Sequence, residues 1–110
     1  MGDSSENIVM EKRTRRQYEL LGMNDNESIA NYFDRIQELV NAMRACKEKI
    51  SNQQVVDKIL RTLPQQFNHV VVAIKESKNL DTMEIEELQY SLKAHEMRIN
   101  KTKVFQEQAL

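Results

Sequence analysis

The segment ESIANYFDRIQELVNAM, residues 27–43, carries the clearest helical pattern of the chain. Its apolar side chains recur at helical intervals: Ile29, Tyr32, Phe33, Ile36, Leu39, Val40 and Met43. This spacing puts them on one side of an α-helix of about five turns. The Asn-Asp-Asn run at residues 24–26 offers N-caps, and Glu27 is expected to put a negative charge in the first turn, which favours the helix dipole. We therefore predict an amphipathic helix that packs one face into a core.

The same periodicity predicts helices before and after residues 27–43. The first covers residues 5–22 and ends at Gly22, a residue type that commonly terminates helices. The third begins at Ser51, whose spacing to Gln54 fits a capping box. It ends before Pro64, because the residue before a proline is pushed out of helical geometry. The fifth opens at residues 81–82, an Asp-Thr pair suited to capping.

Residues 65–78 can be read in two ways. Val70 to Ile74 alone would suit a strand, because β-branched residues favour strands. However, Phe67, Val70, Val71 and Ile74 also follow the i, i+3, i+4, i+7 pattern of a helix, and no partner strand is visible. With 2 Gly and 1 Pro, the chain also has little material for β-turns. We predict an all-α fold, a compact bundle of about five helices.

Composition places the chain among single globular domains. Its 110 residues are 40% apolar and 30% charged, too apolar for disorder and too charged for a membrane protein. No run is long enough to span a membrane, and the first residues do not resemble a signal peptide. The single cysteine, Cys46, has no internal partner for a disulfide, so a cytoplasmic, reducing location is expected.

The sequence carries no recognisable catalytic or metal-binding motif. It contains no Gly-rich phosphate loop, no G-x-S-x-G and no H-E-x-x-H. Cys46, His69 and His95 lie more than 20 residues apart, which is not the patterned spacing of a zinc site. We therefore expect no enzyme activity, no cofactor, no metal, no small-molecule substrate and no membrane partner.

A basic cluster is the one feature that points to nucleic acid. Lys12, Arg13, Arg15 and Arg16 precede Tyr18, a combination able to contact phosphates and stack on a base. The alternative is a solvated face of a helix, because acidic residues lie one turn away from these side chains. The net charge of −1 gives no global attraction to nucleic acid and favours the solvated face.

Several blocks together resemble the Gag polyprotein of copia-type retrotransposons. These blocks are ESIANYFDRI at 27–36, LVNAM at 39–43, VVDKILRTLP at 55–64, VVVAIKESK at 70–78 and SLKAHEMR at 91–98. The resemblance implies a capsid subdomain that assembles into virus-like particles. Glu27, Tyr32 and Arg35 are similar to part of the major homology region of retroviral capsids, although that motif has a glutamine where this chain has Met23. It also implies that RNA is bound mainly through a zinc knuckle, which these residues do not contain.

From the resemblance we expect three parts: a leading helix at 1–22, a capsid-like core at 23–100, and a helix extension or linker at 101–110. The expected partner is another copy of the chain, in dimers or higher assemblies. Candidate interface residues are Val55 and Val56 on the third helix and Val70 and Val72 on the fourth, where apolar residues extend beyond one stripe. The alternatives are a domesticated Gag-derived adaptor and an RNA-binding module that uses the basic cluster.

Overall fold

The computed structural model describes the backbone of residues 4–109 and the side chains of residues 12–104. Within this range the chain forms α-helices and one short 3-10 helix, without a strand. The elements are α1 (Ser4–Leu20), α2 (Ile29–Ala45), α3 (Asn52–Thr62), η1 (Gln65–Phe67), α4 (Asn68–Ser77) and α5 (Ile85–Ala109). The predicted all-α fold is confirmed, and the ambiguous segment 70–74 is helical.

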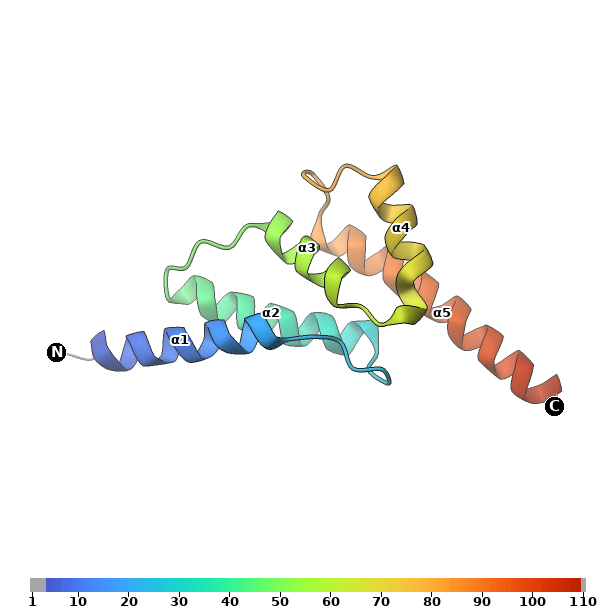
Figure 1. The fold of residues 1–110 in the computed structure, drawn as a ribbon, viewed down its shortest axis with the longest axis horizontal. Coiled ribbons are helices and arrows are strands. Elements are labelled where there is room, and N and C mark those ends of the chain that lie inside the picture. Colours follow the sequence, from blue (N-terminus) through green and yellow to red (C-terminus); the bar gives the residue numbers. More distant parts are fainter. Residues whose placement is uncertain (1–3, 110) are drawn as a thin grey trace.

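The core is built around α2, as its sequence predicts. Of its seven stripe residues, six are buried and only Leu39 remains half-buried. α1 lies antiparallel along one side of α2, while α5 packs against both α2 and α3 (Figure 1). Leu88 and Leu92 of α5 are completely buried, as is Phe67 at the end of η1. Residues far apart in the sequence therefore meet in one apolar cluster.

Helix ends follow the sequence signals at some places only. The capping box is confirmed: Ser51 Oγ accepts from the Gln54 nitrogen at 3.1 Å, and Gln54 Oε1 accepts from the Ser51 nitrogen at 2.8 Å. Leu63, before Pro64, is extended and ends α3 as predicted. By contrast, the N-cap of α2 is Ser28, not one of residues 24–26, and Ser28 Oγ accepts from the Asn31 nitrogen. Glu27 therefore precedes the helix, and its predicted place in the first turn was wrong.

Two predicted helix signals are wrong. Residues 81–82 do not cap α5, which begins only at Ile85. Instead they belong to a turn organised by Asn79, whose Oδ1 accepts from the nitrogen of Asp81. Gly22 follows α1, but its backbone is not left-handed, so it is no glycine cap. The left-handed cap in the described residues is Lys47, with φ 66°, at the end of α2.

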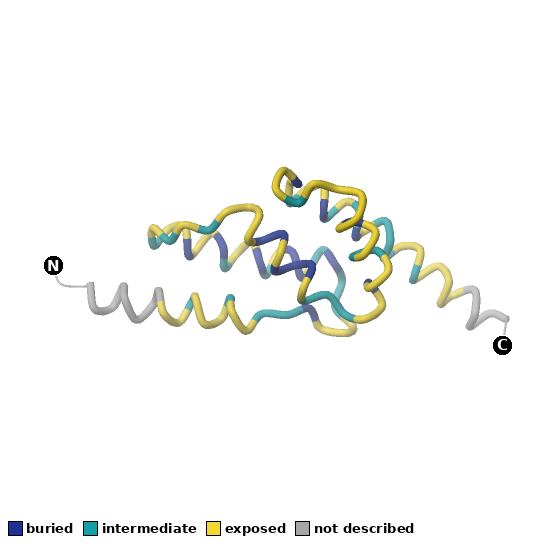
Figure 2. The backbone as a smooth tube through the Cα atoms, turned by 45° about the horizontal axis from the view of Figure 1, so that its top comes forward, coloured by how far each residue is buried: buried dark blue, intermediate teal, exposed yellow. Residues whose placement is uncertain are grey.

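The terminal helices extend beyond the packed centre. The molecule measures 65 × 31 × 17 Å, and its radius of gyration of 16.9 Å exceeds the value of about 13 Å typical of a compact chain this long. Burial is concentrated in α2, α3 and the first half of α5, whereas residues 97–104 of α5 are mostly exposed (Figure 2). Residues 101–109 continue α5 as helix. Long helical surface is therefore left uncovered by the chain's own core.

Candidate functional site

Glu27 and Arg35 form a clamp at the entrance to α2. Glu27 lies in the loop that follows α1, and Arg35 lies two turns into α2. Arg35 Nε donates to Glu27 Oε2 at 2.7 Å, and Arg35 Nη2 donates to Glu27 Oε1 at 2.5 Å. The same Nη2 also donates to the carbonyl oxygen of Gly22 at 2.9 Å. This two-pronged pairing is the geometry in which guanidinium and carboxylate interact most strongly.

The surroundings of the clamp favour the charged forms of both Glu27 and Arg35. The Glu27 side chain is only 9% exposed, and its Oε1 also accepts from the Asn24 nitrogen at 3.1 Å. The hydrogen bonds from Arg35 lower the pKa of Glu27, and those to Glu27 raise the pKa of Arg35. A mostly buried carboxylate needs such partners, because an unpaired charge there would be costly.

Tyr32 connects the clamp to α3. The Arg35 guanidinium carbon lies 5.4 Å from the centre of the fully buried Tyr32 ring, within cation–π distance. The Tyr32 hydroxyl is hydrogen-bonded to Thr62 Oγ1, which donates to the carbonyl oxygen of Lys58 at 2.7 Å. Burial raises the pKa of Tyr32. The structure therefore brings together Glu27, Tyr32 and Arg35, the three residues singled out by their likeness to the major homology region.

Sequence reasoning missed two members of this network. The carbonyl oxygen of Thr62 accepts from the Met23 nitrogen at 3.3 Å, which ties the α1–α2 loop to the end of α3. Gly22 contributes its carbonyl oxygen to Arg35. Both contributions use backbone atoms, which no side-chain pattern identifies. The Met23 side chain, at the position of the motif's glutamine, is 8% exposed and joins the apolar core.

The basic cluster lies along α1 without forming a single positive site. Lys12, Arg13 and Arg16 are exposed. Arg15 is engaged instead, pairing with Glu19 at 3.2 Å and with Glu48 from the α2–α3 connection. These pairs agree with the alternative that this face of α1 is a solvated surface with ion pairs. Glu11, four residues before Arg15, lies outside the described side chains.

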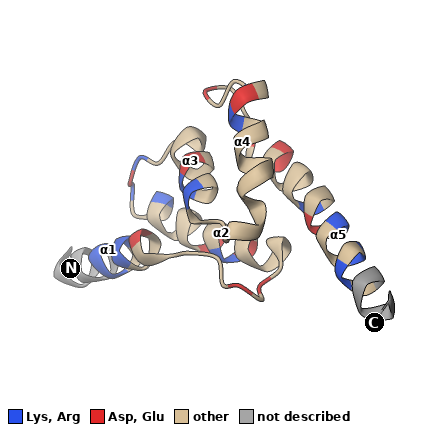
Figure 3. Cartoon of the chain, turned by 45° about the vertical axis from the view of Figure 1, so that its right-hand side comes forward, with Lys and Arg blue, Asp and Glu red and all other residues tan. Residues whose placement is uncertain are grey.

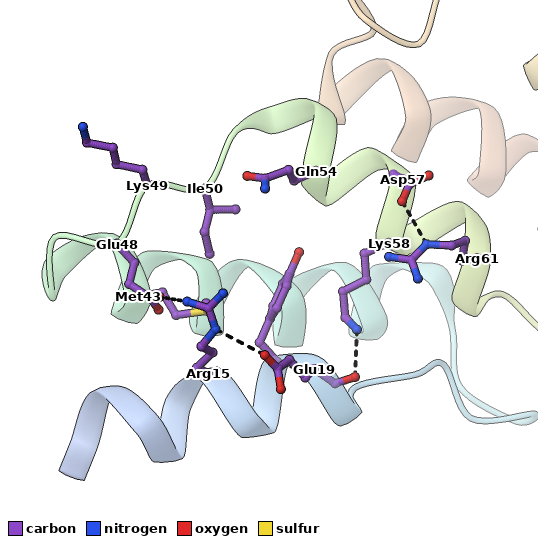
Figure 4. Close-up of a pocket in the computed structure, with 11 residues that line it drawn as sticks. Arg15, Glu19, Met43, Glu48, Lys49, Ile50, Gln54, Asp57, Lys58 and Arg61 are labelled. Carbon is purple, nitrogen blue, oxygen red and sulfur yellow. Dashed lines mark hydrogen bonds and ion pairs between the residues drawn. The ribbon is translucent and has the colours of Figure 1, made fainter. Parts of the chain in front are cut away.

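A groove between α1, the α2–α3 connection and α3 carries charges of both signs (Figure 4). Its basic members include Lys58, which is 7% exposed and donates to the carbonyl oxygen of Glu19 at 3.3 Å. The Lys58 ammonium lies 4.9 Å from the centre of the Tyr18 ring, and burial lowers the pKa of Lys58. Glu19, Glu48 and Asp57 alternate with the basic side chains of the groove. The groove therefore has no uniformly positive potential that would attract a polyanion.

The predicted interface residues divide into two groups. Val55 and Val56 are 1% and 0% exposed and lie in the core, so their placement on a free surface was wrong. Their face of α3 belongs to the buried apolar cluster, and α3 also contacts α5. On α4, Val70 is half-buried against the core, whereas Val72 is 53% exposed. Sequence reasoning missed the most exposed apolar side chains of α5, Tyr90 and Met97.

Other chemistry-bearing residues lie apart from one another. Among the described side chains, no three from His, Cys, Asp and Glu gather into a group that could hold a metal ion. His95 packs against Phe67, with ring centres 5.7 Å apart, and Cys46 is a free, half-buried thiol. No helix in the described residues is long and apolar enough to cross a membrane.

Fold and clamp together define a small all-helical structural module, in which an ionised pair fixes the loop leading into the central helix. The chain matches the family described as the gag-polypeptide of LTR copia-type over residues 4–104, which is nearly its whole length. It belongs to this family, whose members are structural, non-catalytic regions of a polyprotein. Among curated proteins and among solved structures, none matches the chain.

Proposed function

We propose that this domain is the self-assembly module of a copia-type Gag, which binds other copies of itself to build dimers and virus-like particles. Membership of the Gag family supports a structural role of this kind. The observation that carries the proposal is the set of large apolar side chains outside the core on the last two helices. Val72, Tyr90 and Met97 are 53%, 79% and 71% exposed. Exposed apolar surface of this kind is typical of sites that bind another protein.

The clamp of Glu27 and Arg35 also supports the proposal, because it holds the helices in a fixed arrangement. A Gag domain that joins a lattice has to present its helices at fixed angles, because each contact is repeated by symmetry. The network of Glu27, Arg35, Tyr32 and Thr62 fixes the loop between α1 and α2 against α3. We therefore assign the clamp to shaping the module, not to contacting a partner. A free Cys46 agrees with a reducing, cytoplasmic setting for this assembly.

The direct test is sedimentation velocity of the chain over a wide concentration range at moderate salt. Concentration-dependent dimers or larger species are expected, with particles visible by electron microscopy at high concentration. Val72→Asp tests the α4 surface, and Val72→Thr, which keeps the shape, is its matched control. Strictly monomeric chains at every concentration would contradict self-assembly and would raise a Gag-derived adaptor, which captures a different cellular protein, to first place.

RNA binding is the second candidate, and the exposure of Lys12, Arg13 and Arg16 on the projecting α1 supports it. In Figure 3 the Lys and Arg positions colour the described part of the α1 ribbon blue. If these side chains neutralise phosphates, RNA affinity falls steeply with salt, and changing all three to Glu removes it. Affinity that is absent at physiological salt, or unchanged in the triple variant, would exclude this use of the cluster.

A further inference from the structure

The outward side of α5 carries a stripe that the core does not use. Its members are four, four, three and four residues apart, which places them on one face of the helix. They are Glu86, Tyr90, Ala94, Met97 and Lys101, called here the outward stripe, and all are exposed except the half-buried Ala94. The buried Leu88 and Leu92 lie on the opposite side of the same helix. α5 thus has one apolar face for its own core and a second one facing solvent.

The order of residue types along the outward stripe is nearly the same from either end. It has a charged residue at each end, a large apolar residue inside each end, and the small Ala94 in the middle. The end charges are opposite, Glu86 against Lys101. A second copy that runs antiparallel therefore places acid against base at both ends, whereas a parallel copy places like charges together. The pattern is self-complementary about a twofold axis near Ala94.

We propose that a second copy of this chain docks its α5 antiparallel along the outward stripe. Tyr90 then packs against Met97 of the partner subunit, and Glu86 pairs with Lys101 of the partner subunit. The small Ala94 lets the two helices approach closely at the axis. This inference rests on the proposed self-assembly and names one surface and one geometry for it.

The charges along α5 favour another copy over an unrelated partner. Residues 84–92 carry three Glu and no base, whereas residues 93–104 carry four Lys or Arg and only Glu96 as an acid. In Figure 3 acidic colouring lies near the start of α5, and most of the basic colouring lies further along the described part of the helix. Glu87 already pairs with Lys78 at 3.6 Å. Glu86 and Lys101 make no ion pair with any of the described side chains, so both are available.

The contact is small, which fits a lattice contact. The segment from Glu86 to Lys101 spans about 22 Å of helix. A contact along one helix of this length is smaller than the interface of a typical stable dimer, so we expect weak pairing of the isolated chain. A particle multiplies weak contacts into a stable whole, because each copy is held by several neighbours at once.

Charge reversal with rescue tests the pairing. Glu86→Lys and Lys101→Glu should each weaken dimerisation about tenfold at low salt, because a twofold interface contains each pair twice. The swapped double variant should recover most of the loss. Lys103→Glu, an exposed change on another face of the same helix, is the matched control and should have little effect. Circular dichroism checks that each variant is folded. Failure of the double variant to recover would overturn the ion pairing.

Cysteine crosslinking tests the orientation. In a Cys46→Ser background, a mixture of Tyr90→Cys and Met97→Cys chains should form the mixed disulfide faster than either chain crosslinks to itself. A parallel pair would give the reverse result and overturn the proposal. Different results would contradict self-assembly and the α5 interface. If the chain self-associates and no variant of the outward stripe changes this, the α5 interface is excluded but self-assembly is not. A wild-type chain that is monomeric at every concentration, with no crosslinking, removes both.

Discussion

Glu96 Oε2 accepts a hydrogen bond from the backbone nitrogen of Ile29 at 2.7 Å, across 67 residues of sequence. The nitrogen belongs to the first residue of α2, and the carboxylate comes from the middle of α5. The first backbone nitrogens of a helix have no partner within the helix, and a negative charge there also opposes the helix dipole favourably. The last helix therefore completes the cap of the central one.

This cap predicts a stability loss on changing Glu96. Glu96→Ala should lower the free energy of unfolding by about 1–2 kcal/mol, because a partly buried nitrogen loses its acceptor. Glu96→Gln keeps an acceptor oxygen and should lose less. Urea denaturation measures both, with the exposed Glu76→Ala as control, expected within about 0.5 kcal/mol of wild type. Equal effects at positions 96 and 76 would show that the cap does not stabilise the fold.

The clamp predicts a pH dependence of stability. Arg35 holds the pKa of Glu27 in the folded protein below its value in the unfolded chain. The ionised clamp therefore stabilises the fold fully above about pH 4.5, and this contribution is lost as the pH falls through the lowered pKa. The stability difference between wild type and Glu27→Gln should shrink below that pH.

Thermal midpoints between pH 7 and pH 2.5 measure this difference. Asp34→Asn, at an exposed position of α2, is the control and should stay parallel to wild type. A difference between wild type and Glu27→Gln that stays constant down to pH 2.5 would contradict an ionic clamp.

The end of α2 predicts a stabilising substitution. Lys47 has a left-handed φ of 66°, while the Glu48 nitrogen donates to the carbonyl oxygen of Met43 at 3.0 Å. This is the hydrogen-bond pattern of a helix end that normally uses glycine. Lys47→Gly should raise the free energy of unfolding by about 0.5–1 kcal/mol, because glycine adopts this geometry without a Cβ clash. Lys49→Gly, two residues on, should give no gain in the same denaturation experiment.

The buried Val56 and the exposed Val72 should respond to replacement by alanine with very different losses of stability. Val56→Ala should destabilise the fold by about 2 kcal/mol, because it removes methyl groups from a fully buried position. Val72→Ala should change the unfolding free energy by less than about 0.5 kcal/mol, because that side chain is half exposed. Self-association of the two variants, measured separately, shows the reverse order if Val72 contacts another copy.

Local sequence signals predicted most of the helices. The period of apolar residues located α2, and the capping box and Pro64 bounded α3, because these signals act between residues a few positions apart. The start of α5 was misjudged, since Asp81 and Thr82 look like caps to any local reading. In the structure Asn79 holds them in a turn, and the buried Met83 follows before the helix begins.

Helical periodicity and short motifs are properties of neighbouring residues, so the helical class, the inward face of α2 and the family resemblance could all be predicted from the sequence. Which apolar faces are covered depends instead on how the helices pack. The tertiary structure buried Val56 and left Tyr90 outside, although both lie in amphipathic helices. It also joined Glu96 to Ile29 and Thr62 to Tyr32. Such contacts depend on how helices distant in sequence pack together, and no local pattern records that packing.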